Sequence, residues 1–333
     1  MCTYSCRTTE EMLQQFQKSF VSHCRKKYSD LYQSKFINLD FHAMPHFGEE
    51  SRMEKVWCGS RSKSLKGANT LLAQDGASDV ILYTRADILR KNEVQEIKNF
   101  VTYWRDIKGT VDETLVFDCK LTSYEVLGEL DTLEPQVKFI TLRKRNPKLI
   151  EEILKVPDEK WQKVFLPIPK RKNQRFSAYE SKVQLKGCQK KFRQIVVKDH
   201  GRVKPTFIIT NDWGLQLNQV LEVYAKRWHI ENKINELVSF FNLNALSSPL
   251  MIRIHFDIFW TVVADTIYHR FAMDLPRYEN ARAGTVFKRF INFPGRIEYN
   301  GRSFKVKIRK RAHTPLIPWR KEIEQAYLAS LAQ

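Results

Sequence analysis

The stretch Thr114-Leu-Val-Phe-Asp118 is short and apolar, and it ends in an acid. A run of apolar and β-branched residues of this length is typical of a buried strand. The preceding segment, about 92–107, carries apolar residues at helical spacing, and Thr122 or Ser123 is placed to cap a following helix. Another strand is predicted at 137–143. This alternation of strand and helix predicts an α/β domain.

Further strands are predicted on both sides of this unit. Segments 36–41, 68–74 and 79–84 have strand character, which predicts a mixed or partly parallel sheet. Between about 147 and 205, alternating apolar residues separated by basic and turn-like stretches predict a β-rich insertion. The segment 205–212 then returns to a core-type strand.

The C-terminal part of the chain is predicted to be mainly helical. Helices are expected over about 216–241 and 250–273, and Arg296–Ile308 resembles a hairpin with an Asn300-Gly301 turn. These boundaries predict five segments. They are a basic helical segment 1–34, a first core segment 35–146, the insertion 147–205, a second core segment 206–245, and a helical region with a hairpin 246–333.

Charge and hydropathy limit the partners of this chain. Its 333 residues contain 56 Lys and Arg against 37 Asp and Glu, a net charge of +19. Such an excess favours a polyanion, most simply nucleic acid, over a membrane surface. No apolar run of membrane-spanning length occurs, and the first residues lack the apolar core of a signal peptide. We therefore expect a cytoplasmic protein with no membrane association. The scattered cysteines show no zinc spacing.

The segment Tyr224-Ala-Lys-Arg-Trp-His-Ile-Glu231 carries the first candidate site. In a helix, Tyr224, Arg227 and Glu231 lie at i, i+3 and i+7, on one face. A carboxylate can hold a divalent cation, while an adjacent Arg and Tyr can bind a phosphate. The alternative is an amphipathic helix with a solvated Arg and Glu. The apolar stripe of the predicted helix lies on another face, so the core does not occupy Glu231.

Two further acids stand out by position. Asp40 lies within a predicted strand, and Asp118 ends another. A carboxylate among apolar strand residues is costly unless it is paired or bound to a cation. Converging carboxylates suit Mg²⁺, and a pair of such ions promotes phosphodiester cleavage. Taken singly, each acid also fits a strand-end or solvated position.

Three blocks, in this order, resemble the DDE transposases of bacterial insertion sequences, in the subgroup with a Tyr–Arg–Glu–Lys signature. They are Asn38–Gly48, Leu115–Tyr124 and Tyr224–Glu231. The segment Asn242–Ser248 also resembles the family's sequence downstream of the catalytic Glu. The resemblance covers the chain from about residue 36 to its C-terminus.

The resemblance implies an α/β fold: an RNase H-like mixed sheet flanked by helices, with a β-rich insertion and a helical C-terminal region. It implies DNA cleavage at transposon ends and strand transfer into a target, with Mg²⁺ or Mn²⁺, by a homodimer on double-stranded DNA. Asp40, Asp118 and Glu231 would be the catalytic metal ligands. Tyr224 and Arg227 would hold DNA near the cleaved phosphate.

Some positions depart from the family pattern or allow another interpretation. The signature's Lys falls at Val238, and Lys233 is the candidate that supplies the missing DNA contact. With a short segment before the first Asp block, the chain could instead be a truncated, catalytically impaired relic that only binds DNA. Asp40, His42 and His46 share a strand face and suggest a metallohydrolase, although no further ligands with clear spacing accompany them.

Basic runs and tryptophans are the remaining candidates for DNA contact. The basic runs at 143–145, 170–172 and 307–311 suggest a DNA path, or simply solvated faces. Three tryptophans could stack on extruded bases, although each is more typical of an ordinary core or surface position: Trp57, Trp161 and Trp213.

Overall fold

The computed structural model describes residues 7–46, 53–86, 88–167, 174–201, 204–246, 248, 250–292, 294–299, 301 and 303–308. The basic run at 170–172, Asn300 of the predicted turn and the end of the first block at 47–48 lie outside these residues. The chain forms two compact units. Unit 1 comprises Met1–Asn235 and Asn244–Phe259, and unit 2 comprises Glu236–Leu243 and Trp260–Gln333.

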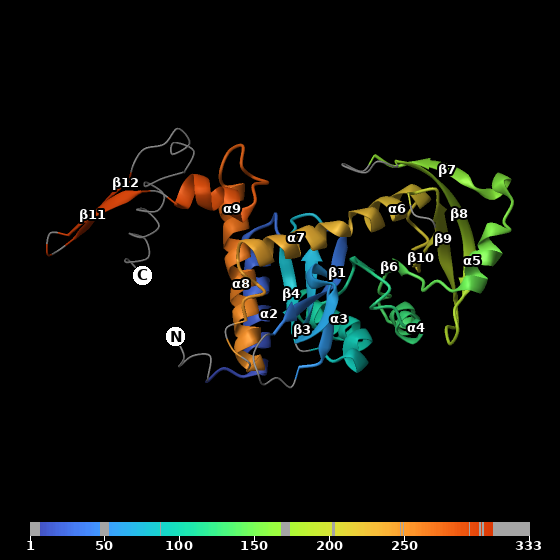
Figure 1. The fold of residues 1–333 in the computed structure, drawn as a ribbon, viewed down its shortest axis with the longest axis horizontal. Coiled ribbons are helices and arrows are strands. Elements are labelled where there is room, and N and C mark those ends of the chain that lie inside the picture. Colours follow the sequence, from blue (N-terminus) through green and yellow to red (C-terminus); the bar gives the residue numbers. More distant parts are fainter. Residues whose placement is uncertain are drawn as a thin grey trace. The chain divides into compact units, whose positions relative to one another are not determined.

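Unit 1 contains a mixed sheet, in which strand β1 (Phe36–Pro45) carries one of the predicted acids (Figure 1). β1 pairs antiparallel with β3 (Lys63–Asp75) and parallel with β5 (Thr114–Phe117). β5 runs parallel to β6 (Phe139–Leu142), which is antiparallel to β10 (Thr206–Thr210). Among the described residues the sheet has ten strands, flanked by helices. The predicted α/β class, with a mixed sheet flanked by helices, is confirmed.

The edges of this sheet are antiparallel. On one side, β3 also pairs with β2 (Lys55–Cys58) and β4 (Ile81–Arg85). On the other side lies the predicted β-rich insertion, whose strands are β7 (Gln162–Phe165), β8 (Arg175–Gln184) and β9 (Lys191–Lys198). Because β9 pairs directly with β10, the insertion extends the core sheet without a break.

Alternation along these strands fixes two opposite apolar faces. Ile195 and Ile208 pack with α6 (Leu217–Lys226) on one face. Val196 and Phe207, the neighbours in sequence, pack on the other face with α5 (Pro147–Leu154). Successive side chains of a strand point to opposite sides, so residues buried on both sides require a helix on each. The sheet is therefore covered on both faces here.

The helices begin and end where their sequences favour it. The Thr9 hydroxyl accepts a bond from the Met12 amide and caps α2 (Glu10–Lys27), which has acids in its first turn and bases in its last. The predicted helix near 92–107 starts as a 3₁₀ turn, Arg90–Gln95, before α3 (Glu96–Lys108). α3 buries Phe100 and Trp104 fully and packs on α2.

Two local predictions differ from the structure. Ser123 occupies the N-cap position of α4 (Tyr124–Thr132), but its side chain makes no capping bond. Thr122 is occupied elsewhere, because its hydroxyl bonds the Asp118 carbonyl and the Thr141 hydroxyl. The single helix predicted over 216–241 is interrupted at Arg227, where i→i−3 bonds replace the α-helical pattern between α6 and α7 (Trp228–Ser239).

Unit 2 is helical with a two-stranded sheet. The predicted helix near 250–273 is α8 (Met251–Met273), whose second half belongs to this unit. It is followed by α9 (Ala283–Val286), a π-helical turn, and the hairpin β11 (Gly295–Tyr299) and β12 (Phe304–Ile308). The unit has a small apolar core: Ala272, Leu275, Val286 and Phe290. No helix in the described part of the chain has the length and apolar character needed to cross a membrane.

Candidate active site

Arg227 connects two of the predicted catalytic acids. Its Nη1 donates a hydrogen bond to Asp40 Oδ2 at 3.1 Å, and its Nη2 donates to Glu231 Oε1 at 2.6 Å. Asp40 lies on β1, while Arg227 and Glu231 lie at the junction of α6 and α7. The side chains of Asp40 and Arg227 are each 16% exposed, and that of Glu231 is 53% exposed. The pairing is therefore largely shielded at Asp40 and open to solvent at Glu231.

Asp118 lies close to this pair. Burial raises the pKa of Asp40 to about 6, Arg227 acts against the rise, and the charges of Asp118 and Glu231 add to it. Asp118 follows β5, which runs parallel to β1, so the two acids belong to neighbouring strands. The Lys120 amide donates to Asp118 Oδ1 at 2.8 Å and orients that carboxylate. The structure thus brings together all three predicted acids.

Tyr224 and Arg227 are also neighbours. The guanidinium carbon of Arg227 lies 6.0 Å from the centre of the Tyr224 ring. Burial raises the pKa of Tyr224 to about 12, with Arg227 opposing the rise and Asp118 adding to it. Burial disfavours the charge on Arg227, but Asp40, Tyr224 and Glu231 outweigh it and raise its pKa above the ordinary value. At neutral pH, Tyr224 is a neutral donor and Arg227 a fixed cation.

These side chains open into one pocket of about 360 Å³. Asp118, Tyr224, Arg227 and Glu231 all line it, and its apolar wall comes from the sheet extension and α6. The pocket is therefore bounded by both the core sheet and the insertion. Its acids, its cation and its phenol are the groups that phosphodiester chemistry uses.

The three carboxylates suit a hard divalent cation, but their positions in the structure are not those of a formed metal site. Three carboxylates provide the oxygen ligands that Mg²⁺ prefers. Among the described residues, however, no three His, Cys, Asp or Glu side chains are grouped closely enough to hold a metal ion. Arg227 instead supplies the positive charge between Asp40 and Glu231. Coordination by all three acids would require Arg227 to release at least one of them.

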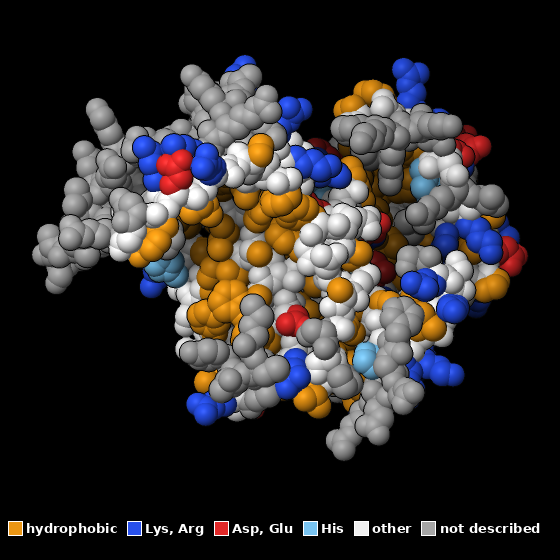
Figure 2. All heavy atoms as spheres, turned by 60° about the vertical axis from the view of Figure 1, so that its left-hand side comes forward, with side chains coloured by type: hydrophobic (Ala, Val, Ile, Leu, Met, Phe, Trp, Pro, Cys, Tyr) orange, Lys and Arg blue, Asp and Glu red, His pale blue; other side chains and the backbone are white. Residues whose placement is uncertain are grey.

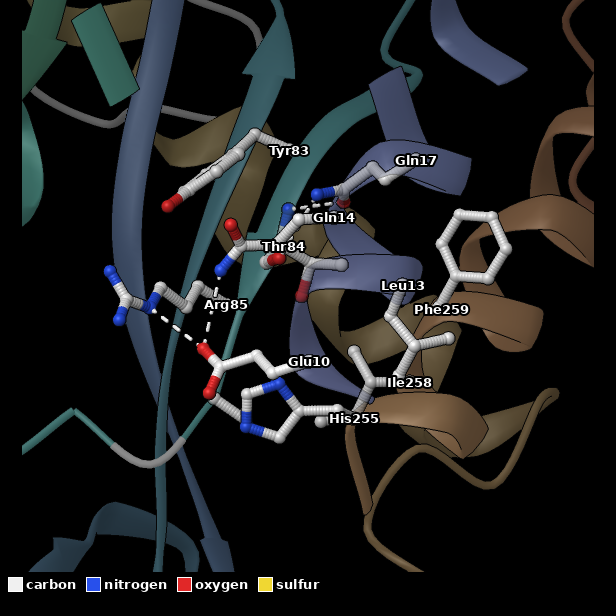
Figure 3. Close-up of a pocket in the computed structure, with 11 residues that line it drawn as sticks. Glu10, Leu13, Gln14, Gln17, Tyr83, Thr84, Arg85, His255, Ile258 and Phe259 are labelled. Atoms are coloured by element: carbon white, nitrogen blue, oxygen red, sulfur yellow. Dashed lines mark hydrogen bonds and ion pairs between the residues drawn. The ribbon is translucent and has the colours of Figure 1, made fainter. Parts of the chain in front are cut away.

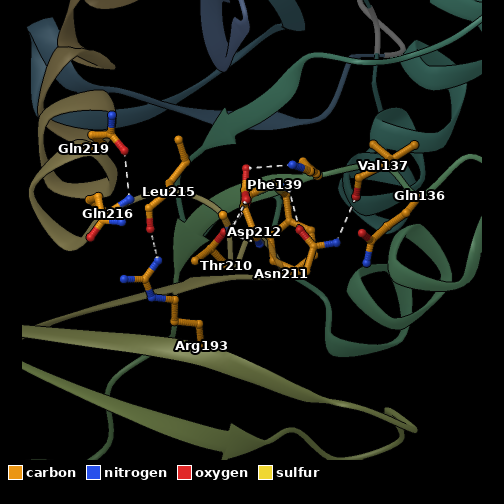
Figure 4. A network of polar contacts seen from close by, with 12 residues as sticks. Gln136, Val137, Phe139, Arg193, Thr210, Asn211, Asp212, Leu215, Gln216 and Gln219 are labelled. Carbon is orange, nitrogen blue, oxygen red and sulfur yellow. Dashed lines mark hydrogen bonds and ion pairs between the residues drawn. The ribbon is translucent and has the colours of Figure 1, made fainter.

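A buried amide fixes the chain that leads into this site (Figure 4). Asn211 follows β10, and its Oδ1 accepts a bond from the Phe139 amide at 2.9 Å. Its Nδ2 donates to the Val137 carbonyl at 3.0 Å and to Asp131 at 3.2 Å. Next along the chain, Gln216 and Gln219 form a capping box at the start of α6. The helix that carries Tyr224 therefore begins from a fixed point on the sheet.

The other predicted site residues lie elsewhere. Lys233 is 8% exposed and does not line the pocket. Burial raises the pKa of Asp79, and the charges of His229 and Lys233 oppose that rise, which places Lys233 near Asp79. A DNA contact by Lys233 stays a prediction. Val238, at the signature's Lys position, is half-buried on α7.

His42 has a structural partner in place of a metal. Its Nε2 lies 2.7 Å from Asn244 Oδ1, which ties the segment after α7 back to β1. His46 is half-buried. The metallohydrolase interpretation is not supported by the described residues, in which no cluster of three ligands includes these histidines.

A second cavity lies between α2, β4 and α8 within unit 1 (Figure 3). Arg85 pairs with Glu96 at 3.3 Å and with Glu10 at 3.6 Å. Gln17 accepts a bond from the Thr84 amide at 2.9 Å and donates to its carbonyl. These contacts satisfy one another and attach α2 to the edge strand. The cavity is explained by packing between these elements.

Figure 2 shows one face of the molecule, on which Lys and Arg side chains lie at several places, with Asp and Glu side chains beside some of them. The full sequence carries a net charge of +19. Sequence reasoning missed Arg227 as the partner of Asp40, since the two are separated by 187 residues. Local sequence patterns do not report contacts between residues so far apart, so they carry no signal for this pair.

Comparison with known proteins identifies no family. No protein-family model matches the chain, and no curated protein matches it either. Among solved structures, a similar chain is that of a cryo-EM structure of the piggyBac transposase synaptic complex with hairpin DNA, with a TM-score of 0.43 and 12% identity. The match covers 78% of this chain and 56% of that one, so the chain spans little more than half the length of its neighbour. At this similarity the match carries no assignment of function.

Proposed function

We propose that this chain is a DNA transposase that cleaves DNA at transposon ends and joins the freed strand to a target. Asp40, Asp118 and Glu231 would hold Mg²⁺, with Mn²⁺ as a substitute. The observation that carries the proposal is the gathering of these acids around Arg227 from β1, the end of β5 and α7. A purely structural ion pair would not need a third carboxylate beside it, since that charge opposes ionisation of Asp40.

The side chains have distinct roles in this proposal. A divalent cation bound by the acids would polarise the phosphodiester and activate the attacking oxygen. Arg227, charged at any working pH, would bind a non-bridging phosphate oxygen once released from an acid. Tyr224, protonated at neutral pH, would donate a hydrogen bond to the same phosphate. Together the two residues would hold the phosphate against the carboxylates.

The finer assignments rest on the sequence blocks. We propose that the chain belongs to a bacterial insertion sequence of the Tyr–Arg–Glu–Lys subgroup and acts in the cytoplasm. Its partner would be double-stranded DNA, bound as a homodimer. The excess of 56 basic over 37 acidic residues supports a polyanionic partner.

A second candidate is a relic that binds DNA without cutting it. Two observations favour it: Val238 at the signature's Lys position, and the lack of a ready metal cage among the described residues. Both candidates share the basic surface and differ in metal-dependent chemistry.

The deciding experiment is cleavage of DNA carrying the flanks of the encoding locus, with Mg²⁺ or Mn²⁺. We expect new 3′-hydroxyl ends that need the metal and are absent with Asp40→Ala. If the unchanged chain and Asp40→Ala bound this DNA with equal affinity and neither protein cleaved it, the result would establish the relic instead.

A further inference from the structure

Trp57 is the most open tryptophan of the described chain. Its exposed fraction is 61%, against 49% for Trp213 and 43% for Trp260. Trp213 has Lys182 5.4 Å from its ring centre, and buried Trp161 has Lys198 at 4.2 Å. Among the described residues, the Trp57 ring makes no ring-stacking or cation–π contact. An indole left this open leaves a large apolar area in water.

The strand register surrounds Trp57 with small and basic side chains. β2 alternates, with Val56 and Cys58 buried and Lys55 and Trp57 exposed. Trp57 pairs with Ser64 of β3, and Lys55 pairs with Lys66. Cross-strand partners share a face, so Lys55, Trp57, Ser64 and Lys66 form one exposed patch. Ser64 is too small to cover the indole, which leaves the ring face accessible.

The surroundings of this patch are also basic. Arg61 and Arg90 are exposed nearby, on the same hairpin or beside it. Glu54, the acid that precedes Lys55 in sequence, accepts a bond from the Arg90 amide at 2.9 Å. A single aromatic ring among cations has the chemistry of nucleic-acid stacking surfaces. A protein-binding surface would instead need an apolar cluster, and the neighbours of Trp57 on this face are polar.

We propose that Trp57, Lys55 and Lys66 form a stacking platform for an unpaired base of the bound DNA, a proposal that rests on the transposase function above. The indole stacks on the base, and the two lysines contact the flanking phosphates. No bond is made or broken at this platform.

The register also relates the platform to the acids. On β3, Ser64 pairs with Trp57, and Leu72 pairs with Asp40. These two positions are separated by an even number of residues, so Trp57 and Asp40 lie on the same side of the strand. Eight residues of strand span about 27 Å.

The test uses the full chain and two probes, an oligothymidine of about 16 nucleotides and a duplex of equal length. We expect Trp57→Ala to weaken oligothymidine binding about tenfold while changing duplex affinity less than twofold. Trp57→Phe should restore most of the loss. The matched control is Trp213→Ala, which removes an exposed tryptophan whose ring is already engaged by Lys182. Lys55→Ala with Lys66→Ala should lower the salt slope for the oligothymidine by about 1.4.

Three results would overturn the proposal. Equal oligothymidine affinity of Trp57→Ala and the unchanged chain would remove Trp57 from the DNA path. An equal loss with Trp213→Ala would show a non-specific effect. A drop in self-association of Trp57→Ala in sedimentation, without a change in DNA affinity, would make the patch a protein interface. If the unchanged chain showed no metal-dependent cleavage, while Trp57→Ala still weakened oligothymidine binding, the result would count against the transposase function alone.

Discussion

Arg227 Nη1 lies 3.1 Å from Asp40 Oδ2, and this bond connects the junction of α6 and α7 with strand β1 of the sheet. The same guanidinium holds Glu231 at 2.6 Å, so one cation balances two acids. The arrangement lets the acids lie close together without a bound cation. In the proposed function, binding of a phosphate by Arg227 and binding of a metal by the acids would therefore be coupled, because each would free the other group.

Replacing Arg227 should affect DNA binding first. We expect Arg227→Ala to weaken duplex binding and to lower the slope of log K against log salt by about one, because one phosphate contact is lost. Arg227→Lys should keep the slope but bind more weakly, since Lys lacks the two-pronged geometry. Filter binding over a salt series measures both. An unchanged slope for Arg227→Ala would leave Arg227 with a structural role only.

Asp118→Asn should abolish metal-dependent cleavage and leave duplex affinity within about twofold, because it removes a ligand and no phosphate contact. The control is Asp112→Asn, an exposed acid just before β5 whose loss should leave cleavage unchanged. Cleavage by Asp118→Asn at the rate of the unchanged chain would exclude Asp118 from the site.

Asp40 should make stability depend on pH. Its pKa is raised from 3.8 to about 6 in the folded chain, so the folded state binds its proton more tightly than the unfolded state. Stability from this group is fully present below about pH 4 and is lost as pH rises through about 6. The loss amounts to about 3 kcal/mol for a shift of about two units. Asp40→Asn should lack this loss.

Urea unfolding of both chains between about pH 4 and pH 8 checks this prediction, because the two chains differ only at residue 40. The difference in unfolding free energy between Asp40→Asn and the unchanged chain should grow with pH. A difference that stays constant over that range would mean that Asp40 titrates normally.

Asn211 should be important for stability. Asn211→Ala removes three hydrogen bonds and leaves the Phe139 amide and Val137 carbonyl buried without this partner. We expect a loss of about 2–4 kcal/mol in unfolding free energy. Asn218→Ala, at an exposed position of α6, should change it by less than about 0.5 kcal/mol. A loss below about 1 kcal/mol for Asn211→Ala would mean that another group replaces the amide.

Gly67 should tolerate no side chain. It pairs with Pro45 at the end of β1, and a Cβ there would come within 2.2 Å of the Met44 carbonyl oxygen. Gly67→Ala must therefore separate β1 from β3, and we expect it to lower the melting temperature by several degrees. Gly59→Ala is the matched control, because open space surrounds a Cβ at that position. Equal melting temperatures for the two variants would contradict the close approach.

Local patterns predicted much of the fold. The apolar run before Asp118 predicted β5, and helical spacing predicted α3 and α8, because these signals depend on neighbouring residues. Two features depend on distant ones and were not predictable. The bond between Arg227 and Asp40 joins residues 187 positions apart. The pairing of β9 with β10, which merges the insertion into the core sheet, depends on which strand edge is left open.

The candidate site was predicted only as a set of residue types. Sequence blocks indicated Asp40, Asp118 and Glu231, but nothing in them revealed that a single Arg would neutralise two of these acids. The break at Arg227 was also hidden, since Tyr224 to Glu231 contains no Gly or Pro to interrupt a helix. From the sequence, Lys233 was expected to be accessible near Glu231. Two positions along a helix place a side chain on a different face, and on that face Lys233 is buried.

The continuous sheet restricts how this chain can change length over evolution. β10 pairs with β6 on one side and with β9 on the other. A residue inserted in β6 or β9 would therefore shift the pairing register of these strands beside the acids. Insertions and deletions should therefore accumulate in the connections from β7 to β8 and from β8 to β9, at the outer rim. Homologues of different size would then share the same core strands and differ only in the length of the outer edge of the sheet.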